Sequence, residues 1–291
     1  MTTLIIGATG QIAAPVFRHL HRDAVPVRSF SRDAGKAASV LDTPGADITD
    51  GSFGDPAALD RAFADVDRVL LSAWPMAPEQ RAAQCAVIDA AARAGIAQLV
   101  RVSVLSAGHA ALGAIQRSHA VLDDYLRASG VPHTILRPAV FDSTLVAQTA
   151  SLVAADGTLT GSAPAGRIPF IDPMDVSRSA FAVLTSPATW NREYDLTGPG
   201  LLSYPDVAGL LAAELGTPVR YQALRPDELR ALLSARGLPD AAVEVALARD
   251  AATEAGENEH LTDNVEHLTG RVPTPLSRYL HEHRAAYLVA V

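Results

Sequence analysis

Apolar and polar positions alternate with two different periods along the first half of the chain, and this predicts strands separated by helices. Short apolar runs predict strands at residues 4–6, 25–30, 46–48, 66–72, 99–103 and 133–137. Between them, apolar residues recur at helical spacing, which predicts helices at 12–20, 33–41, 77–94 and 111–129, and Pro56 opens another. This order predicts a doubly wound parallel sheet, the Rossmann type of α/β fold.

The pattern is less regular after Pro138. It predicts a helix at 144–155, a strand at 167–171, a helix at 176–184 and a strand at 193–196 that returns to the main sheet. A helix at 205–215, a strand at 219–223 and further helices follow. We therefore expect a Rossmann domain over residues 1–200, with an excursion at 141–170 towards a smaller C-terminal α/β substrate lobe over residues 201–291.

The turn that links the first strand to the first helix is the first candidate binding site. It reads Gly7-Ala-Thr-Gly10, and the small residue Ala13 follows where helix and strand pack closest. Gly7 allows the tight turn, and Gly10 lets the backbone approach a ligand without a Cβ in the way. Unpaired N–H groups and the helix dipole make such a turn suitable for a pyrophosphate. The expected contacts are Gly7, Thr9, Gly10, Gln11 and Ile12.

Composition narrows the class of protein. The 291 residues are 48% hydrophobic and 19% charged, with a formal net charge of -8 and no segment dense in lysine or arginine. This acidic balance argues against nucleic acid as a ligand. The single cysteine, Cys85, and the absence of a signal-peptide pattern predict a cytoplasmic protein, and no apolar stretch is long enough for a membrane helix.

Several segments together carry a resemblance to a known family. Besides the GATG turn, they are Leu99-Val-Arg-Val-Ser103, the run from Ala128 to Pro138, Pro169-Phe-Ile-Asp-Pro-Met-Asp175 and Leu261-Thr-Asp-Asn-Val-Glu-His-Leu-Thr-Gly270. In these segments the chain resembles the NmrA-like branch of the atypical short-chain dehydrogenases/reductases. The resemblance covers nearly the whole length and implies a nicotinamide dinucleotide cofactor. This family includes quinone-reductase-like and isoflavone-reductase-like enzymes as well as redox-sensing regulators.

The end of the second strand bears on which dinucleotide binds. An NAD-specific site usually carries Asp or Glu there, to bind the ribose hydroxyls and repel a 2′-phosphate. This chain has Ser31-Arg32, a hydroxyl and a planar cation that match a phosphate, with Lys36 close by. NADP(H) is therefore favoured, although Asp33 leaves NAD(H) open and Arg32 would alternatively be a solvated loop cation. Further expected cofactor contacts are Ser52, Phe53, Ser72, Ala73, Trp74, Ser103, His119 and Pro138.

The resemblance also indicates which catalytic groups are missing. Short-chain dehydrogenases use a Tyr-x-x-x-Lys dyad for proton transfer, and alignment of the central helix puts Ile115 and His119 at these two positions. Lys36 is the only lysine of the chain. Isoflavone-reductase relatives are thought to use a lysine at the position of His119, which makes His119 a candidate for acid–base catalysis or ribose binding. The alternative is a histidine that only satisfies a backbone carbonyl.

Residues that follow strands four, five and six are candidates for the substrate site. Ser103 after strand five is a candidate substrate-orienting serine, or a cap of the next turn. Trp74 and Phe141 offer aromatic walls for a flat apolar acceptor such as a quinone, which needs no strong general acid. The expected substrate contacts are Trp74, His109, Ile115 and Phe141.

Three functions remain open at this stage. The first is an NAD(P)H-dependent oxidoreductase that transfers hydride to a quinone or similar conjugated carbonyl. The second is a non-catalytic NADP(H)-sensing regulator that binds a protein partner, and the third is a natural-product tailoring reductase. A homodimer through the long central helices is compatible with each of them. No metal site is expected, because His281 and His283 point to different faces of a helix.

Overall fold

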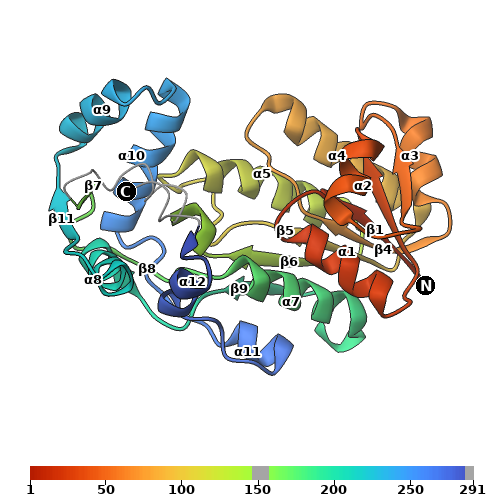
Figure 1. Cartoon of the computed structure of the whole chain (residues 1–291). Helices are drawn as coiled ribbons and strands as arrows, with labels where there is room; N and C mark the ends of the chain where they lie inside the picture. The colour runs from red at the N-terminus through yellow and green to blue at the C-terminus, as the bar shows by residue number, and fades with distance from the viewer. Residues whose placement is uncertain (146–156, 286–291) are drawn as a thin grey trace.

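A seven-stranded parallel sheet forms the centre of the computed structural model, which describes residues 1–145 and 157–285 (Figure 1). Its strand order is β3-β2-β1-β4-β5-β6-β9, so the chain winds outward in both directions from β1. All six neighbouring pairs are parallel. The strands are β1 (Thr2–Ile6), β2 (Val27–Ser31), β3 (Asp47–Asp50), β4 (Val66–Leu71), β5 (Gln98–Val102), β6 (His133–Pro138) and β9 (Glu193–Leu196).

Helices cover both faces of this sheet, which confirms the predicted doubly wound Rossmann fold. Side chains alternate along each strand, so Ile5 packs in one cluster with Phe17, whereas Leu4 and Ile6 pack in the other with Leu59. The helices of this region are α1 (Ala13–Arg22), α2 (Ala34–Leu41), α3 (Pro56–Phe63), α4 (Pro78–Ala94), α5 (Ala114–Ala128) and α7 (Pro173–Thr185).

The segment after β6 joins the last third of the chain and then returns to the sheet. β7 (Thr158–Gly161) pairs in parallel with β11 (Arg220–Ala223), and the short β8 (Arg167–Ile168) pairs antiparallel with β10 (Leu202–Ser203). The predicted return strand is present as β9, parallel to β6. Figure 1 shows most of the last third, in cyan and blue, at the left of the sheet, with α11 below β9 and α7.

Helices make up most of this last third. They share an apolar cluster with the segment that follows β6, so Phe170 packs with Val207 and Leu280. The helices are α8 (Tyr204–Leu215), α9 (Pro226–Ala235), α10 (Asp240–Glu254), α11 (Asn264–Thr269) and α12 (Leu276–Glu282). In the part of the chain that the structure describes, no helix has both the length and the apolar character needed to cross a membrane.

Several sequence-based boundaries differ from the structure. The helix predicted at 111–129 begins only at Ala114, after an irregular segment, and the strand predicted at 167–171 is two residues long. Pro138 ends β6 and lies within it, since it pairs with Leu196. Neither β7 nor β10 was expected from the sequence. Most of the helix predicted at 144–155 falls outside the described residues.

Candidate active site

The β1–α1 turn has the geometry of a phosphate cradle. Gly7 has φ +86°, and a Cβ at this position would lie 1.9 Å from the Ser72 carbonyl oxygen, so only glycine fits. The Gly10 N–H donates to the Gly7 carbonyl at 2.9 Å, and Gly10 itself is exposed. Exposed Thr9 and Gln11 flank it, whereas the Ile12 side chain is buried in the core. The turn therefore presents backbone, not side chain, to a ligand at the start of α1.

A cavity of about 590 Å³ lies at the carboxyl ends of the first four strands. Such an edge is where ligands bind in open α/β sheets. Five residues expected to contact a cofactor line this cavity, which we call the cofactor cleft: Arg32, Ser52, Phe53, Ala73 and Trp74. Arg32 is exposed, and the Phe53 ring packs edge-on against Phe30 at 5.1 Å between centroids. The cleft thus has the cation Arg32 and an apolar wall, and Glu79 of α4 also lines it.

The other expected cofactor residues, including those of the β1–α1 turn, do not line this cleft, and three of them have other roles. The Ser31 hydroxyl donates to the Asp33 carbonyl at 3.0 Å. Lys36 is exposed on α2, and Ser72 lies beneath Gly7, where its N–H donates to the Ile6 carbonyl at 3.1 Å. The Asp33 carboxylate, which had left NAD(H) open, accepts from the Lys36 N–H at 2.8 Å and so caps α2. Arg32 is accordingly the side chain at this strand end that faces the cleft.

A smaller cavity of about 150 Å³ adjoins the cofactor cleft at Trp74, which lines both. We call it the substrate pocket. Its walls are mostly apolar and include Ile115, Phe141 and Pro138. Its remaining wall comes from α10 and the segment after it, through Val245, Ala248, Arg249 and Asn258. These four residues could not be identified from the sequence, because they lie more than 100 residues after Phe141 and follow no recognisable pattern.

His119 belongs to a buried polar cluster next to Trp74. Arg101 on β5 is fully buried, and its Nη1 pairs with Asp123 while its Nη2 lies 3.1 Å from His119 Nδ1. Because a guanidinium only donates, Nδ1 is the acceptor and the imidazole proton sits on Nε2. Burial, followed by the Arg101 charge, lowers the pKa of His119 well below its usual value of 6.5. His119 is therefore a neutral Nε2–H donor.

The Nε2 atom of His119 is the unsatisfied end of this cluster. It is buried and has no hydrogen-bond partner within residues 1–145 and 157–285. The His119 ring packs edge-on against Trp74 with 6.3 Å between centroids, so this donor lies close to the wall shared by the cleft and the pocket. A buried donor without a partner costs free energy unless a ligand accepts from it. It is therefore a candidate contact for a bound cofactor.

Two expected site residues lie elsewhere. Ser103 is buried, and its hydroxyl donates to Asp123 at 2.8 Å, so it stabilises the Arg101–Asp123 pair and is not presented to a substrate. His109 is exposed and its Nε2 lies 2.7 Å from Asp124 Oδ2, outside the residues that line the substrate pocket. The sequence could have drawn attention to Arg101, since it is a cation between apolar neighbours of a buried strand.

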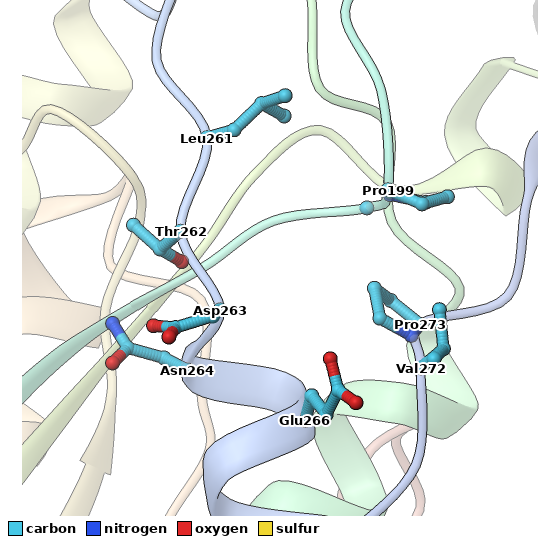
Figure 2. A pocket seen from close by; sticks show the side chains of 9 residues that line it. Pro199, Leu261, Thr262, Asp263, Asn264, Glu266, Val272 and Pro273 are labelled. Carbon is cyan, nitrogen blue, oxygen red and sulfur yellow. The ribbon is translucent and has the colours of Figure 1, made fainter.

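A further cavity of about 630 Å³ lies at the carboxyl end of β9 beside α11. Figure 2 shows Glu266 pointing into the space between Pro199 and Pro273, with Asp263 and Asn264 nearby. Two carboxylates at the rim disfavour a dinucleotide phosphate there. The cavity thus lacks the chemistry of the cofactor cleft.

Metal-ligating side chains do not gather in the described structure, where no group of three or more His, Cys, Asp or Glu could hold a metal ion. His281 Nδ1 faces Glu214 at 3.3 Å, whereas the His283 ring stacks on Tyr279. Cys85 is half-buried, and burial raises the pKa of its thiol.

Comparison with known proteins agrees with this site. Residues 7–187 match the family described as NAD(P)H-binding. The chain is 33% identical over 288 residues to the (4-alkanoyl-5-oxo-2,5-dihydrofuran-3-yl)methyl phosphate reductase of Streptomyces griseus, and 28% identical over 284 residues to the NAD(P)H azoreductase of Xenophilus azovorans. Each match covers 98% of both chains.

A solved structure of an NADPH-dependent quinone oxidoreductase from Escherichia coli has the same fold. It superposes with a TM-score of 0.86 at 26% identity, with 96% of this chain and 98% of that chain covered. These findings confirm the nicotinamide dinucleotide that the sequence motifs led us to expect. The chain thus belongs to the NAD(P)H-binding family.

Proposed function

We propose that this protein is an NAD(P)H-dependent oxidoreductase that transfers hydride to a quinone or similar conjugated carbonyl. The observation that carries the proposal is the shared Trp74 wall between the cofactor cleft and the substrate pocket. A nicotinamide held at the end of the cleft would meet an acceptor in the pocket directly. The relatives include an NADPH-dependent quinone oxidoreductase, a (4-alkanoyl-5-oxo-2,5-dihydrofuran-3-yl)methyl phosphate reductase and an NAD(P)H azoreductase, which supports the reduction of a small organic acceptor here.

The cofactor's phosphates would bind at the β1–α1 turn. Gly7 allows the tight turn and exposed Gly10 leaves its backbone uncovered, so a pyrophosphate could approach and accept from the N–H groups at the start of α1. Arg32 would bind the 2′-phosphate as a planar cation, and the Asp33 carboxylate is committed to the α2 cap. We therefore propose NADPH as the preferred cofactor. When bound, it would supply the hydride.

The residues at the reaction centre position the reactants and exclude water. Ile115 occupies the position of the missing tyrosine and lines the substrate pocket, where it offers no proton. Neutral His119 would donate its Nε2–H to a ribose hydroxyl of the cofactor. A quinone accepts hydride readily, so orientation in an apolar pocket supplies most of the acceleration and the proton comes from water.

The test is NADPH oxidation by the purified protein with 2-methyl-1,4-benzoquinone as acceptor. Wild-type protein is expected to turn over, and Trp74→Ala is expected to lower kcat/KM by at least about tenfold because the shared wall is lost. Half-buried Trp190 is not a suitable control, since it packs on the core, but Leu261→Ala removes an exposed apolar side chain that does not line the substrate pocket. Tight NADPH binding without turnover of any acceptor would point instead to a sensing protein.

A further inference from the structure

Two polar side chains from the C-terminal third line the substrate pocket. They are Arg249, near the end of α10, and Asn258, which follows this helix. Among the described residues that line the pocket, Arg249 is the one charged side chain, and most of the others are apolar. Its charge is paired with the Asp250 carboxylate, so Arg249 acts at the pocket as a fixed, charge-assisted hydrogen-bond donor and not as a lone charge.

The position of Arg249 is fixed by a buried carboxylate. Its Nε and Nη2 donate to Asp250 Oδ1 at 3.2 and 2.9 Å, and Asp250 is fully buried. Asp250 also accepts from the Tyr204 hydroxyl at 3.0 Å and from the Ser162 N–H at 2.7 Å. Donors from three parts of the chain therefore hold Asp250, and Asp250 in turn holds Arg249 at the pocket.

Asn258 provides an independent sign of a ligand. It is only 5% exposed and lines the pocket. Its carboxamide atoms are not among the fully buried side-chain atoms that lack a partner, so they are open to the pocket, where a polar atom of a ligand can pair with them. That polar atom is best supplied by the bound substrate.

The size of the pocket indicates how large that substrate is. An apolar cavity of about 150 Å³ holds a molecule the size of benzene, and the substrate pocket has about this volume. A single six-membered ring therefore fits between Trp74, Phe141 and Ile115, with its substituent oxygen towards Arg249 and Asn258.

We propose that Arg249 and Asn258 bind an oxygen of a single-ring acceptor, the oxygen on which negative charge develops during reduction. This inference rests on the proposed function. Hydride brings two electrons and forms a new C–H bond at a conjugated ring carbon, while a π pair moves onto the carbonyl oxygen. The nicotinamide is oxidised, the acceptor becomes an oxyanion, and the oxyanion takes its proton from water. Donors preorganised for this charge favour the transition state over the bound acceptor.

The test uses 4-nitrophenol, a single-ring probe whose phenol and phenolate forms differ in colour, bound to the full-length protein saturated with NADP⁺. The wild-type protein is expected to bind the phenolate at least about tenfold more tightly than the phenol, which lowers the apparent pKa of the probe by about one unit. Asn258→Leu and Arg249→Met are each expected to reduce this preference at least about fivefold. Arg225→Met removes an exposed cation of the same region and is expected to leave it unchanged.

Equal preference for phenolate in wild type, Asn258→Leu and Arg249→Met would overturn the inference. If Arg249→Met does not fold, as judged by circular dichroism, the phenolate preference of Asn258→Leu alone tests the inference. If benzoate competes with the probe for the pocket as strongly as the phenolate binds, the oxygen that Arg249 and Asn258 bind belongs to a carboxylate that the acceptor carries before reduction. Because the probe is not reduced, a shifted pKa without quinone turnover would contradict the proposed function and leave the oxyanion site standing.

Discussion

Arg101 and His119 are joined inside the protein by a contact of 3.1 Å between Nη2 and Nδ1, and both side chains are buried. This contact determines the tautomer of His119, because the guanidinium can only donate, so Nδ1 accepts the hydrogen bond and the imidazole proton lies on Nε2. It also keeps the imidazole neutral, since burial and the Arg101 charge both lower its pKa. His119 thus serves as a hydrogen-bond donor at neutral pH and not as an imidazolium acid.

The first prediction concerns the pH dependence of cofactor binding. Because the pKa of His119 lies well below 6.5, its proton count does not change between pH 6 and pH 8. The Kd for NADPH should therefore contain no pH dependence that is due to His119. Titrations at several pH values should give the same pH dependence of Kd in the wild type and in His119→Ala. The same variant should weaken NADPH binding up to about tenfold through loss of one hydrogen bond. His109→Ala, an exposed histidine paired with Asp124, is the matched control. A loss of affinity below pH 7 that disappears in His119→Ala would contradict a neutral His119.

The second prediction concerns the buried Arg101–Asp123 pair. Arg101→Met removes the buried cation of Asp123 and leaves Arg137, whose Nε lies 3.8 Å from Asp123 Oδ2, as a weaker partner, so the free energy of unfolding should fall by about 3 kcal/mol. Asp123→Asn in the same background removes the stranded charge and should restore part of that loss. Urea denaturation of the two single variants and the double variant measures the coupling. If the losses in free energy of unfolding of the two single variants sum to the loss of the double variant, the two side chains do not stabilise each other, which would contradict the prediction.

Much of the fold was predictable from the sequence because local pattern determined it. Apolar runs such as Leu4–Ile6 and the capping residues Pro56 and Gly95 lie where the structure begins or ends its elements. The pairing of β7 with β11 was not predictable in this way. Both strands are short, neither alternates clearly, and about 60 residues separate them, so only tertiary contact determines their partnership.

The candidate site likewise contains residues that could be predicted from local pattern and residues that only tertiary packing determines. Residues at strand ends, such as Arg32, Trp74 and Phe141, could be placed because parallel strands end at a common edge. Ser103 also follows a strand end, but its side chain points inward and donates to Asp123. The direction of a side chain at a strand end depends on tertiary packing and could not be predicted from the sequence. Arg249 reaches the pocket because α10 packs against α5. No sequence motif near either helix predicts this packing.

The third prediction concerns Asp142, whose side chain is fully buried with neither carboxyl oxygen hydrogen-bonded in the described structure. Burial, followed by the charges of Asp172 and Asp175, raises its pKa to about 8. The folded chain therefore keeps a proton that the unfolded chain loses above about pH 4, so stability falls as pH rises from about 4 to about 8.

Asp142→Asn should remove this dependence. The variant should be more stable than the wild type at pH 8 by about 2 kcal/mol or more, with a much smaller difference at pH 4. Urea denaturation of both proteins at these two pH values is the measurement. A variant that is equally or less stable at pH 8 would show that Asp142 carries its charge in the folded protein at little cost.

The fourth prediction concerns cofactor choice. Arg32→Ala should raise the Kd for NADPH about tenfold or more, because one charge-assisted contact to the 2′-phosphate is lost, and should leave the Kd for NADH nearly unchanged. Arg22→Ala, an exposed arginine at the far end of α1, should change neither value. Equal NADPH affinity in wild type and Arg32→Ala would remove the basis for an NADPH preference.

The measurement that tests the central claim most directly is a crystal structure of the protein with NADP⁺ bound. The pyrophosphate should lie on the Gly7–Gly10 turn, within hydrogen-bond distance of the N–H groups at the start of α1. The nicotinamide ring should lie against Trp74 with its reactive carbon facing the pocket lined by Phe141 and Arg249. A dinucleotide bound away from this turn, or a nicotinamide directed away from the pocket, would contradict the account.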